Sequence, residues 1–432
     1  MDDFLTAELA RRWVLGIQRG LERMDKVLGY LGLPDDGLGL RLVVGGTNGK
    51  GSTCTFLDSM LRRAGYRTGH YTSPHIYSAQ ERIQVDGRNA DPALLQQAIT
   101  DTATAEAACN VTLTGFEWIT VVGARCLSLA RVQVSILEVG LGGRLDAVNA
   151  LAPQLTVLTP VDLDHCDILG NALEDIVSEK TPLFRRGLPG VVAAQSPQAA
   201  ALIARDLEAL GPAPLWVAGR DFQARRDQDG LFSYRQGDAG VDRVRLGLRG
   251  RFQVTNASAA LAALELAVQQ GLLPALPTRA LEEGLAMASK AGRLQVLPFG
   301  GKQIILDAGH NGHAAAALTE ALLEEALVPD AVLTGLLATK EPAPVLDQLA
   351  RLGAALNFCP IPDHAHHAPE ALVAGLPAGV RGAAHQDPVE AFQRLLADPA
   401  VETLLCFGSH YLLGALCRGV PGLREAAGLC ID

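Results

Sequence analysis

The chain has 432 residues, 48% of them apolar and 19% charged, and this length exceeds what one hydrophobic core usually supports, so we expect two or three domains. The net charge of −10 disfavours a nucleic-acid-binding protein, which normally presents a basic face. The acidic start "MDDFL" is unlike a signal peptide and no segment has the apolar length of a membrane span, so we expect a cytoplasmic protein without a membrane anchor.

Short apolar runs alternate with longer Ala- and Leu-rich segments, which predicts an α/β protein with mainly parallel sheets. In the first part we expect strands at residues 40–46, 132–140, 154–161 and 190–195. Each of these runs is nearly continuously apolar, as in a strand covered on both faces. Between residues 219 and 251 the pieces are short and alternating, which predicts a small antiparallel excursion.

A helical run begins at Asn256, and the strand-helix rhythm then restarts at residues 302–309, 330–337, 354–361 and 402–409. This restart places a domain boundary near residue 290 and predicts domains at 1–289 and 290–432. The eight cysteines are scattered and form no C-x-x-C pair. They indicate reduced thiols rather than a zinc ribbon or a disulfide framework.

The stretch "VVGGTNGKGST" directly follows the first apolar strand and precedes a segment with helical spacing. It departs from the usual Walker A pattern, because Val44 stands at the early glycine position and Gly51 separates Lys50 from Ser52. In a strand-loop-helix context, backbone N–H groups and a helix N-terminus can still hold phosphate oxygens. We therefore favour a phosphate site, with Lys50 on the outer phosphates and Ser52 toward a metal, over an ordinary glycine-rich turn.

Three further residues lie where a nucleotide site would need them. Glu138 ends the strongest apolar strand, and a carboxylate there points to the crevice where α/β folds bind ligands. His165 follows the next strand, and Lys180 lies in the helical piece "EDIVSEK". Alone, each has an ordinary alternative: a solvated acid, a structural histidine and a solvated lysine. The nearby "GLGGRL" is no dinucleotide fingerprint, because Leu145 occupies its last glycine position.

Seven motifs then occur together, in order: "GTNGKGS", "YTSPHIYSAQERI", "ILEVGLGGRLDAVN", "DHCDILGNALEDIVSEK", "GRFQVTNA", "GRLQVL" and "ILDAGHN". In this order and spacing the chain resembles the folylpolyglutamate synthase and dihydrofolate synthase family of the Mur ligase superfamily, from about residue 20 to about residue 415. The resemblance implies a Mur-ligase-like α/β fold. A central parallel-sheet ATP-binding domain with a P-loop and a pterin pocket would precede a smaller Rossmann-like C-terminal glutamate-ligase domain.

The resemblance also implies an ATP-dependent amide ligase that uses Mg²⁺, with room for a second magnesium ion and a monovalent cation such as K⁺. Its substrates would be dihydropteroate, folates and L-glutamate, and a monomer is expected. Lys180 matches a lysine that is carbamylated in similar enzymes, and Lys50, Lys180 and His310 are the implied catalytic groups. The implied ATP-binding residues are Asn48, Gly49, Lys50, Gly51, Ser52, Thr53, Asn256, Arg293 and Asp307. The implied metal ligands are Ser52, Ser73, Glu138 and His165.

Two segments, "LTGFE" and "LDA", match those that line the dihydropteroate pocket in bacterial bifunctional members. The implied pocket residues are Thr114, Gly115, Phe116, Glu117, Leu145, Asp146 and Ala147. Phe116 would stack on the flat ring or belong to the core, and Asp146 would accept hydrogen bonds from the pterin. The chain departs from the family pattern at three places: Phe252, where histidine is usual; residues 307–311, which read D-A-G-H-N where D-G-A-H-N is common; and Thr339, where an acid is frequent.

Two alternatives stay open from the sequence. A peptidoglycan ligase of the same superfamily would need a sizeable domain before the loop, and the loop already begins at Gly46. A nucleotide-hydrolysing regulator would need the loop and the metal ligands but not the pterin segments.

Overall fold

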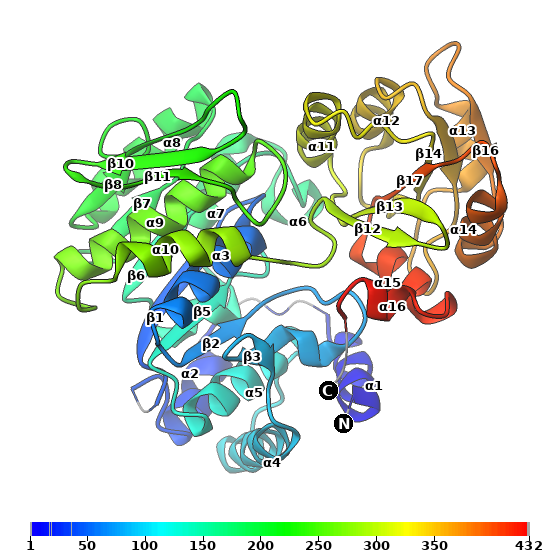
Figure 1. Cartoon of the computed structure of the whole chain (residues 1–432). Helices are drawn as coiled ribbons and strands as arrows, with labels where there is room; N and C mark the ends of the chain where they lie inside the picture. The colour runs from blue at the N-terminus through cyan, green and yellow to red at the C-terminus, as the bar shows by residue number, and fades with distance from the viewer. Residues whose placement is uncertain (1, 17, 19, 36, 430–432) are drawn as a thin grey trace. The chain divides into compact units, whose positions relative to one another are not determined.

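The computed structural model describes residues 2–16, 18, 20–35 and 37–429, and it divides into two compact units (Figure 1). The first unit holds residues 1–247 and 254–288, and the second holds residues 248–253 and 289–432. Each unit is built around its own sheet. The chain passes to the second unit briefly at Leu248–Gln253 and finally after Ala288.

The first unit contains an eight-stranded sheet in which β2, β5, β1, β6, β7 and β8 run parallel, while β3 and β4 add an antiparallel edge. In spatial order its strands are β4 (Arg88–Asn89), β3 (Ile83–Val85), β2 (Thr68–Tyr71), β5 (Val134–Glu138), β1 (Leu40–Gly45), β6 (Leu155–Leu158), β7 (Gly190–Val192) and β8 (Leu215–Val217). The central strands β5 and β6 are buried along their whole length, which explains their uninterrupted apolar sequence.

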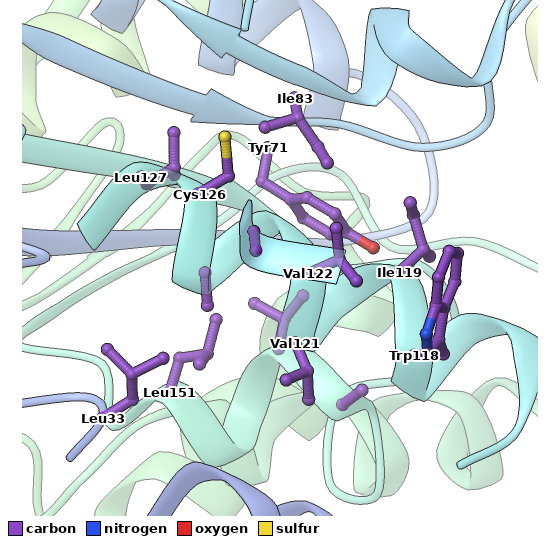
Figure 2. Close-up of a cluster of buried hydrophobic side chains, with 14 of the residues drawn as sticks. Leu33, Tyr71, Ile83, Trp118, Ile119, Val121, Val122, Cys126, Leu127 and Leu151 are labelled. Carbon is purple, nitrogen blue, oxygen red and sulfur yellow. The ribbon is translucent and has the colours of Figure 1, made fainter. Parts of the chain in front are cut away.

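Helices and short 3₁₀ turns connect these strands. They are α1 (Asp2–Trp13), α2 (Glu22–Tyr30), α3 (Lys50–Arg63), η1 (Ala79–Arg82), α4 (Pro92–Cys109), α5 (Gly115–Leu129), η2 (Ala147–Leu151), α6 (Cys166–Leu169), α7 (Leu173–Lys180), η3 (Thr181–Leu183), α8 (Pro197–Leu210), α9 (Gln253–Gln269) and α10 (Thr278–Met287). Helix α5 supplies much of one core, where Trp118, Val122 and Leu127 pack with Tyr71 of β2 (Figure 2). This packing fixes α5 against the strands that carry the candidate site.

The predicted antiparallel excursion is confirmed as a separate three-stranded sheet. Its order is β11 (Ala239–Val244), β10 (Phe232–Gln236) and β9 (Gln223–Arg226). Tyr234 of β10 is buried, and its hydroxyl donates to Glu265 of α9 at 2.7 Å. The small sheet is thereby attached to the helix that follows it.

The second unit has a six-stranded sheet, parallel except for its first strand. In spatial order the strands are β12 (Gln295–Phe299), β13 (Lys302–Asp307), β17 (Thr403–Phe407), β14 (Ala331–Thr334), β15 (Ala355–Phe358) and β16 (Gly382–Ala384). Its helices are α11 (Gly312–Glu324), α12 (Pro342–Ala350), α13 (Pro369–Ala374), α14 (Pro388–Ala397), α15 (His410–Gly419) and α16 (Leu423–Ala426). The strands predicted in this half are confirmed.

Two composition-based expectations concern the whole chain. Among the described residues, no helix combines the length and apolar character that a bilayer crossing needs. The seven described cysteines are free thiols, and Cys430 lies outside the described residues.

The close packing of α10 on α3 generates a stability prediction (Figure 1). A Cβ at Gly284 would lie 2.4 Å from Met60 Cα, and Ser59 Oγ donates to the Gly284 carbonyl at 2.7 Å. We expect Gly284→Ala to force α10 away from α3 and to lower the free energy of unfolding by about 1–3 kcal/mol. Urea unfolding would measure this change.

Gly29→Ala is the matched control, because Gly29 is also helical but has no atom within 4 Å of an added Cβ. That variant should be neutral or stabilised by about 0.5–1 kcal/mol. Equal stability of the two variants would contradict the proposed helix contact.

Candidate active site

The loop between β1 and α3 requires glycine at two positions. Gly46 has φ +136°, and a Cβ there would lie 2.0 Å from Thr159 Oγ1. Gly49 has φ +89°, and a Cβ there would lie 2.2 Å from Asn256 Oδ1. Both the backbone angle and the neighbours therefore exclude larger residues, and Asn256 of α9 lies directly against the loop. The strand-loop-helix context predicted for residues 46–53 is observed.

The loop is attached to the segment after β6. The N–H groups of Thr47 and Asn48 donate to the Pro160 carbonyl at 2.9 and 3.3 Å, and Thr47 Oγ1 donates to the Asp162 carbonyl at 2.9 Å. Helix α3 then starts at Lys50, with Gly51, Ser52 and Thr53 in its first turn and buried. A helix N-terminus of this kind attracts anions because its first N–H groups have no partner within the helix.

Two lysines donate to the same carbonyl oxygen, that of Gly46. Lys50 Nζ and Lys180 Nζ each lie 3.0 Å from it, and Lys50 Nζ also donates to the Thr47 carbonyl at 3.0 Å. Lys180 is buried, and desolvation, followed by the positive charge of Lys50, lowers the pKa of Lys180 to about 7. A substantial fraction of Lys180 is therefore a neutral amine near neutral pH, as reaction with CO₂ requires.

Glu138 supplies a buried carboxylate at the end of β5. Parallel pairing of β5 with β2 brings it beside the residues that follow Tyr71. Thr72 Oγ1 and the Ser73 N–H, the latter at 3.3 Å, both donate to its Oε2, whereas no described residue donates to Oε1. A carboxylate has more acceptor capacity than these two bonds use, so Glu138 can also accept a cation or water. This donor set of carboxylate and hydroxyl oxygens therefore fits Mg²⁺.

His165 comes from the segment after β6, at the first turn of α6. It has φ +53°, its ring is half-buried, and its N–H donates to Asp164 Oδ1 at 2.8 Å. The predicted phosphate and metal residues thus all lie at the same edge of one parallel sheet. They are the loop after β1, Ser73 after β2, Glu138 at the end of β5 and His165 after β6. This is the edge at which α/β folds bind ligands.

The two predicted pterin segments meet at Gly140, two residues beyond Glu138. A Cβ at Gly140 would lie 2.4 Å from Phe116 Cζ, so the half-buried Phe116 ring covers this glycine. From the second segment, Asp146 accepts the N–H groups of Gly140 and Leu141 at 3.0 and 2.8 Å. Leu145 is half-buried and Ala147 is buried beside Asp146.

The two carboxylates of these segments, Asp146 and Glu117, already accept hydrogen bonds from backbone N–H groups. Asp146 accepts a third bond from Val148 N at 2.9 Å, and burial raises its pKa to about 6 despite these bonds and the charge of Lys50. Glu117 forms a capping box with Thr114 and an ion pair with Arg23, with Nη2 2.7 Å from Oε1. Both carboxylates therefore shape their turns, and a direct bond from either to a ligand stays a prediction.

Comparison with known proteins places this geometry in a family. The Mur ligase middle domain model matches residues 44–264. Folylpolyglutamate synthase from Lacticaseibacillus casei is 30% identical over 413 residues, covering 93% of this chain and 94% of the relative. The dihydrofolate synthase/folylpolyglutamate synthase of Bacillus subtilis is 31% identical, over 74% of this chain and 76% of that protein. The structure of E. coli FolC in complex with DHPP and ADP matches with a TM-score of 0.85 and 30% identity, over 97% of this chain and 98% of that one.

The chain belongs to the folylpolyglutamate synthase/dihydrofolate synthase family. It is a Mur-ligase-like α/β protein and an ATP-dependent ligase that attaches glutamate in folate metabolism. Nucleotide and divalent-metal binding accompany this activity, and a Yersinia pestis bifunctional synthase solved with AMPPNP and a Mn ion has the same fold, with a TM-score of 0.85 and 29% identity. The regulator and peptidoglycan-ligase alternatives are thereby disfavoured.

The second unit of this ligase carries its own polar group at the end of β13. Buried Asp307 accepts the N–H groups of Leu294 and Gly309, each at 2.8 Å, and burial raises its pKa although Arg293 counteracts the shift. Arg293 Nη2 lies 3.3 Å from His410 Nε2, and the rings of His310 and His410 are 6.4 Å apart. The predicted residues Arg293, Asp307 and His310 are thus near neighbours, and their roles toward ATP stay predictions.

Sequence reasoning missed several residues that complete these groups. Thr72 donates to Glu138, Thr159 closes the loop against Gly46, and His410 joins Arg293. Each follows the end of a strand, namely β2, β6 and β17. A polar residue at or just after the end of an apolar strand is a candidate site residue. This pattern was used in the sequence only for Glu138 and His165.

The lowered pKa of Lys180 predicts a pH dependence of stability. The unfolded lysine stays protonated up to about pH 10.5, whereas the folded one loses its proton near pH 7. Between these values the unfolded state binds more protons, so stability should rise with pH by at most about 1.4 kcal/mol per pH unit. In CO₂-free buffer, Lys180→Met should remove this rise in urea unfolding measured from pH 7 to 9.

Lys26→Met is the control, because Lys26 is an exposed lysine in α2. Its unfolding curves should keep the pH dependence of the original protein. An unchanged slope in the Lys180 variant would show that Lys180 is protonated in the folded protein at these pH values.

Proposed function

We propose that this ligase joins L-glutamate to dihydropteroate, and also extends the terminal glutamate of folates. The observation that carries the proposal is the meeting of the Thr114–Glu117 and Leu145–Ala147 turns at Gly140, two residues along the chain from Glu138 at the end of β5. If the pterin ring stacked on Phe116, the rest of the pteroate would lie at the edge of the sheet that carries the phosphate loop. The FolC structure with DHPP and ADP supports this choice of substrate.

The chemistry follows from the poor reactivity of a carboxylate. A carboxylate oxygen of the pteroate attacks the γ-phosphorus of ATP, the bond to the β-phosphate oxygen breaks, and ADP leaves. The glutamate amine then attacks the carbonyl carbon of the acyl phosphate. The C–O bond to phosphate breaks, inorganic phosphate leaves, and the amine loses a proton as the amide forms. No side chain acts as a nucleophile in this scheme.

Charge neutralisation is the main demand, because two anions meet in the first step. Lys50, fixed at the loop by two carbonyl groups, would face the transferred phosphoryl group, and the α3 N-terminus would hold phosphate oxygens. Ser52, Ser73, Glu138 and His165 would hold Mg²⁺, which supplies Lewis-acid neutralisation of the phosphates when bound. A second Mg²⁺, K⁺, and the roles of Asn48 and Thr53 stay predictions from the resemblance.

We further propose that Lys180 is carbamylated in the working enzyme. Its buried ammonium group, with a pKa of about 7, would first lose one proton, and the neutral amine would then attack CO₂ and lose a second proton, so that a cation becomes a carbamate anion. That change would relieve repulsion from Lys50, which shares the Gly46 carbonyl with it. A cytoplasmic monomer is the accompanying expectation for this enzyme.

A substrate panel tests the proposed pocket. ADP release with ATP and L-glutamate should be strong with dihydropteroate and measurable with tetrahydrofolates, and absent without a pteroate. Phe116→Leu keeps apolar bulk over Gly140 but removes the aromatic face. We expect it to raise the dihydropteroate KM about three- to tenfold, with the ATP KM unchanged. No turnover with any pteroate would overturn the proposal.

Lys50→Ala tests the phosphate role. Loss of the cation that faces the developing negative charge should reduce kcat at least about a hundredfold in the same assay. Arg63→Ala, which removes an exposed cation at the other end of α3, should retain normal turnover. Near-normal glutamate-dependent ADP release by the Lys50 variant would contradict the assignment.

A further inference from the structure

A buried ion pair connects the N-terminal helix α1 to α4. Arg12 Nη1 and Nη2 lie 2.7 and 2.8 Å from the two carboxylate oxygens of Glu106, and the residues are only 6% and 8% exposed. A bidentate pair of this kind fixes geometry as well as charge. Because apolar residues can often replace a buried pair without loss of stability, the pair points to a positional role.

The same two side chains hold both backbone groups of Leu113. Arg12 Nη1 donates to the Leu113 carbonyl at 3.0 Å, and Glu106 Oε1 accepts the Leu113 N–H at 2.8 Å. Leu113 directly precedes Thr114, the N-cap of α5 and the first residue of the proposed pterin turn. The ion pair therefore fixes the chain at the point where it enters that turn.

Helix α1 also contacts Gly115 within the turn and Trp118 directly after it. The Trp13 ring lies against Gly115, where an added Cβ would be 2.9 Å from Trp13 Cε3. The Arg12 guanidinium lies over the Trp118 ring, 5.1 Å from its centroid, and Trp118 itself is anchored in the core of α5 (Figure 2). Leu113, Gly115 and Trp118 are thus all held by two consecutive residues of α1.

We propose that Arg12 and Glu106 are positioning residues that hold the Thr114–Glu117 turn in its pteroate-binding arrangement. This inference rests on the proposed function, because it takes that turn as the pteroate site. Neither side chain need touch the ligand, since each acts through the backbone of Leu113. The pair should therefore influence pteroate binding far more than ATP binding, whose loop follows a different strand.

The test uses the full chain and three variants. Arg12→Met/Glu106→Met replaces the pair by apolar groups and leaves no buried charge unpaired, and Arg12→Lys keeps the charge but not the bidentate fork. Arg11→Met is the matched control, because Arg11 is the exposed neighbour that pairs with Glu8 alone. Steady-state ADP release gives KM for dihydropteroate and ATP, calorimetry gives both dissociation constants with ADP in place of ATP, and thermal unfolding gives Tm.

We expect the double variant to fold and to raise the dihydropteroate KM and Kd about tenfold or more, with the nucleotide values within about twofold. Arg12→Lys should lie between, and Arg11→Met should match the original enzyme. Unchanged pteroate values in a folded double variant would overturn the inference, as would parallel losses of pteroate and nucleotide affinity. If the double variant does not fold, Arg12→Lys decides by the same two criteria.

The proposed function fails differently. If Phe116→Leu leaves the dihydropteroate KM unchanged, the turn is not the pteroate site, whatever the ion pair does. If Phe116→Leu raises that KM and the ion-pair variants do not, only the positioning role is wrong.

Discussion

The Gly46 carbonyl oxygen accepts hydrogen bonds from Nζ of both Lys50 and Lys180, and the rest of the site depends on this shared contact. Two cations on one oxygen repel each other, and one of them is almost fully buried. The lowered pKa favours neutral Lys180, which removes this repulsion, and an anion beside Lys50 would reduce it further. Phosphate binding therefore fits the charge balance of the loop itself, independently of any motif.

Local sequence could predict the site residues whose positions depend on where a strand ends. Continuous apolar runs located β1, β5 and β6, and parallel strands end at one edge, so the loop, Glu138 and His165 were expected near one another. The antiparallel edge of β3 and β4 was not predicted, because these strands are two and three residues long. Two or three residues are too few to show the alternation of apolar and polar residues that predicts a strand.

Contacts between distant segments could not be predicted from the residues alone. Lys180 is 134 residues from Gly46, His410 is 117 residues from Arg293, and Glu106 is 94 residues from Arg12. A buried lysine or arginine has the same sequence signature as a solvated one in a helix. Family resemblance supplied Lys180 as a candidate, whereas the Arg12–Glu106 pair was found only from the three-dimensional structure.

Hydrogen bonds at the end of β2 connect the proposed pteroate-binding turn, Thr114–Glu117, to Glu138. Thr120 Oγ1 donates to the Phe116 carbonyl at 2.7 Å, and since its one proton is used there, Tyr71 must donate to Thr120 across the 2.9 Å contact. Tyr71 ends β2, packs against α5 (Figure 2), and is followed by Thr72, which donates to Glu138. Phe116, through Thr120 and Tyr71, and Glu138, through Thr72, are thus both hydrogen-bonded to the end of β2. The sheet therefore fixes the position of the proposed pteroate-binding turn relative to Glu138.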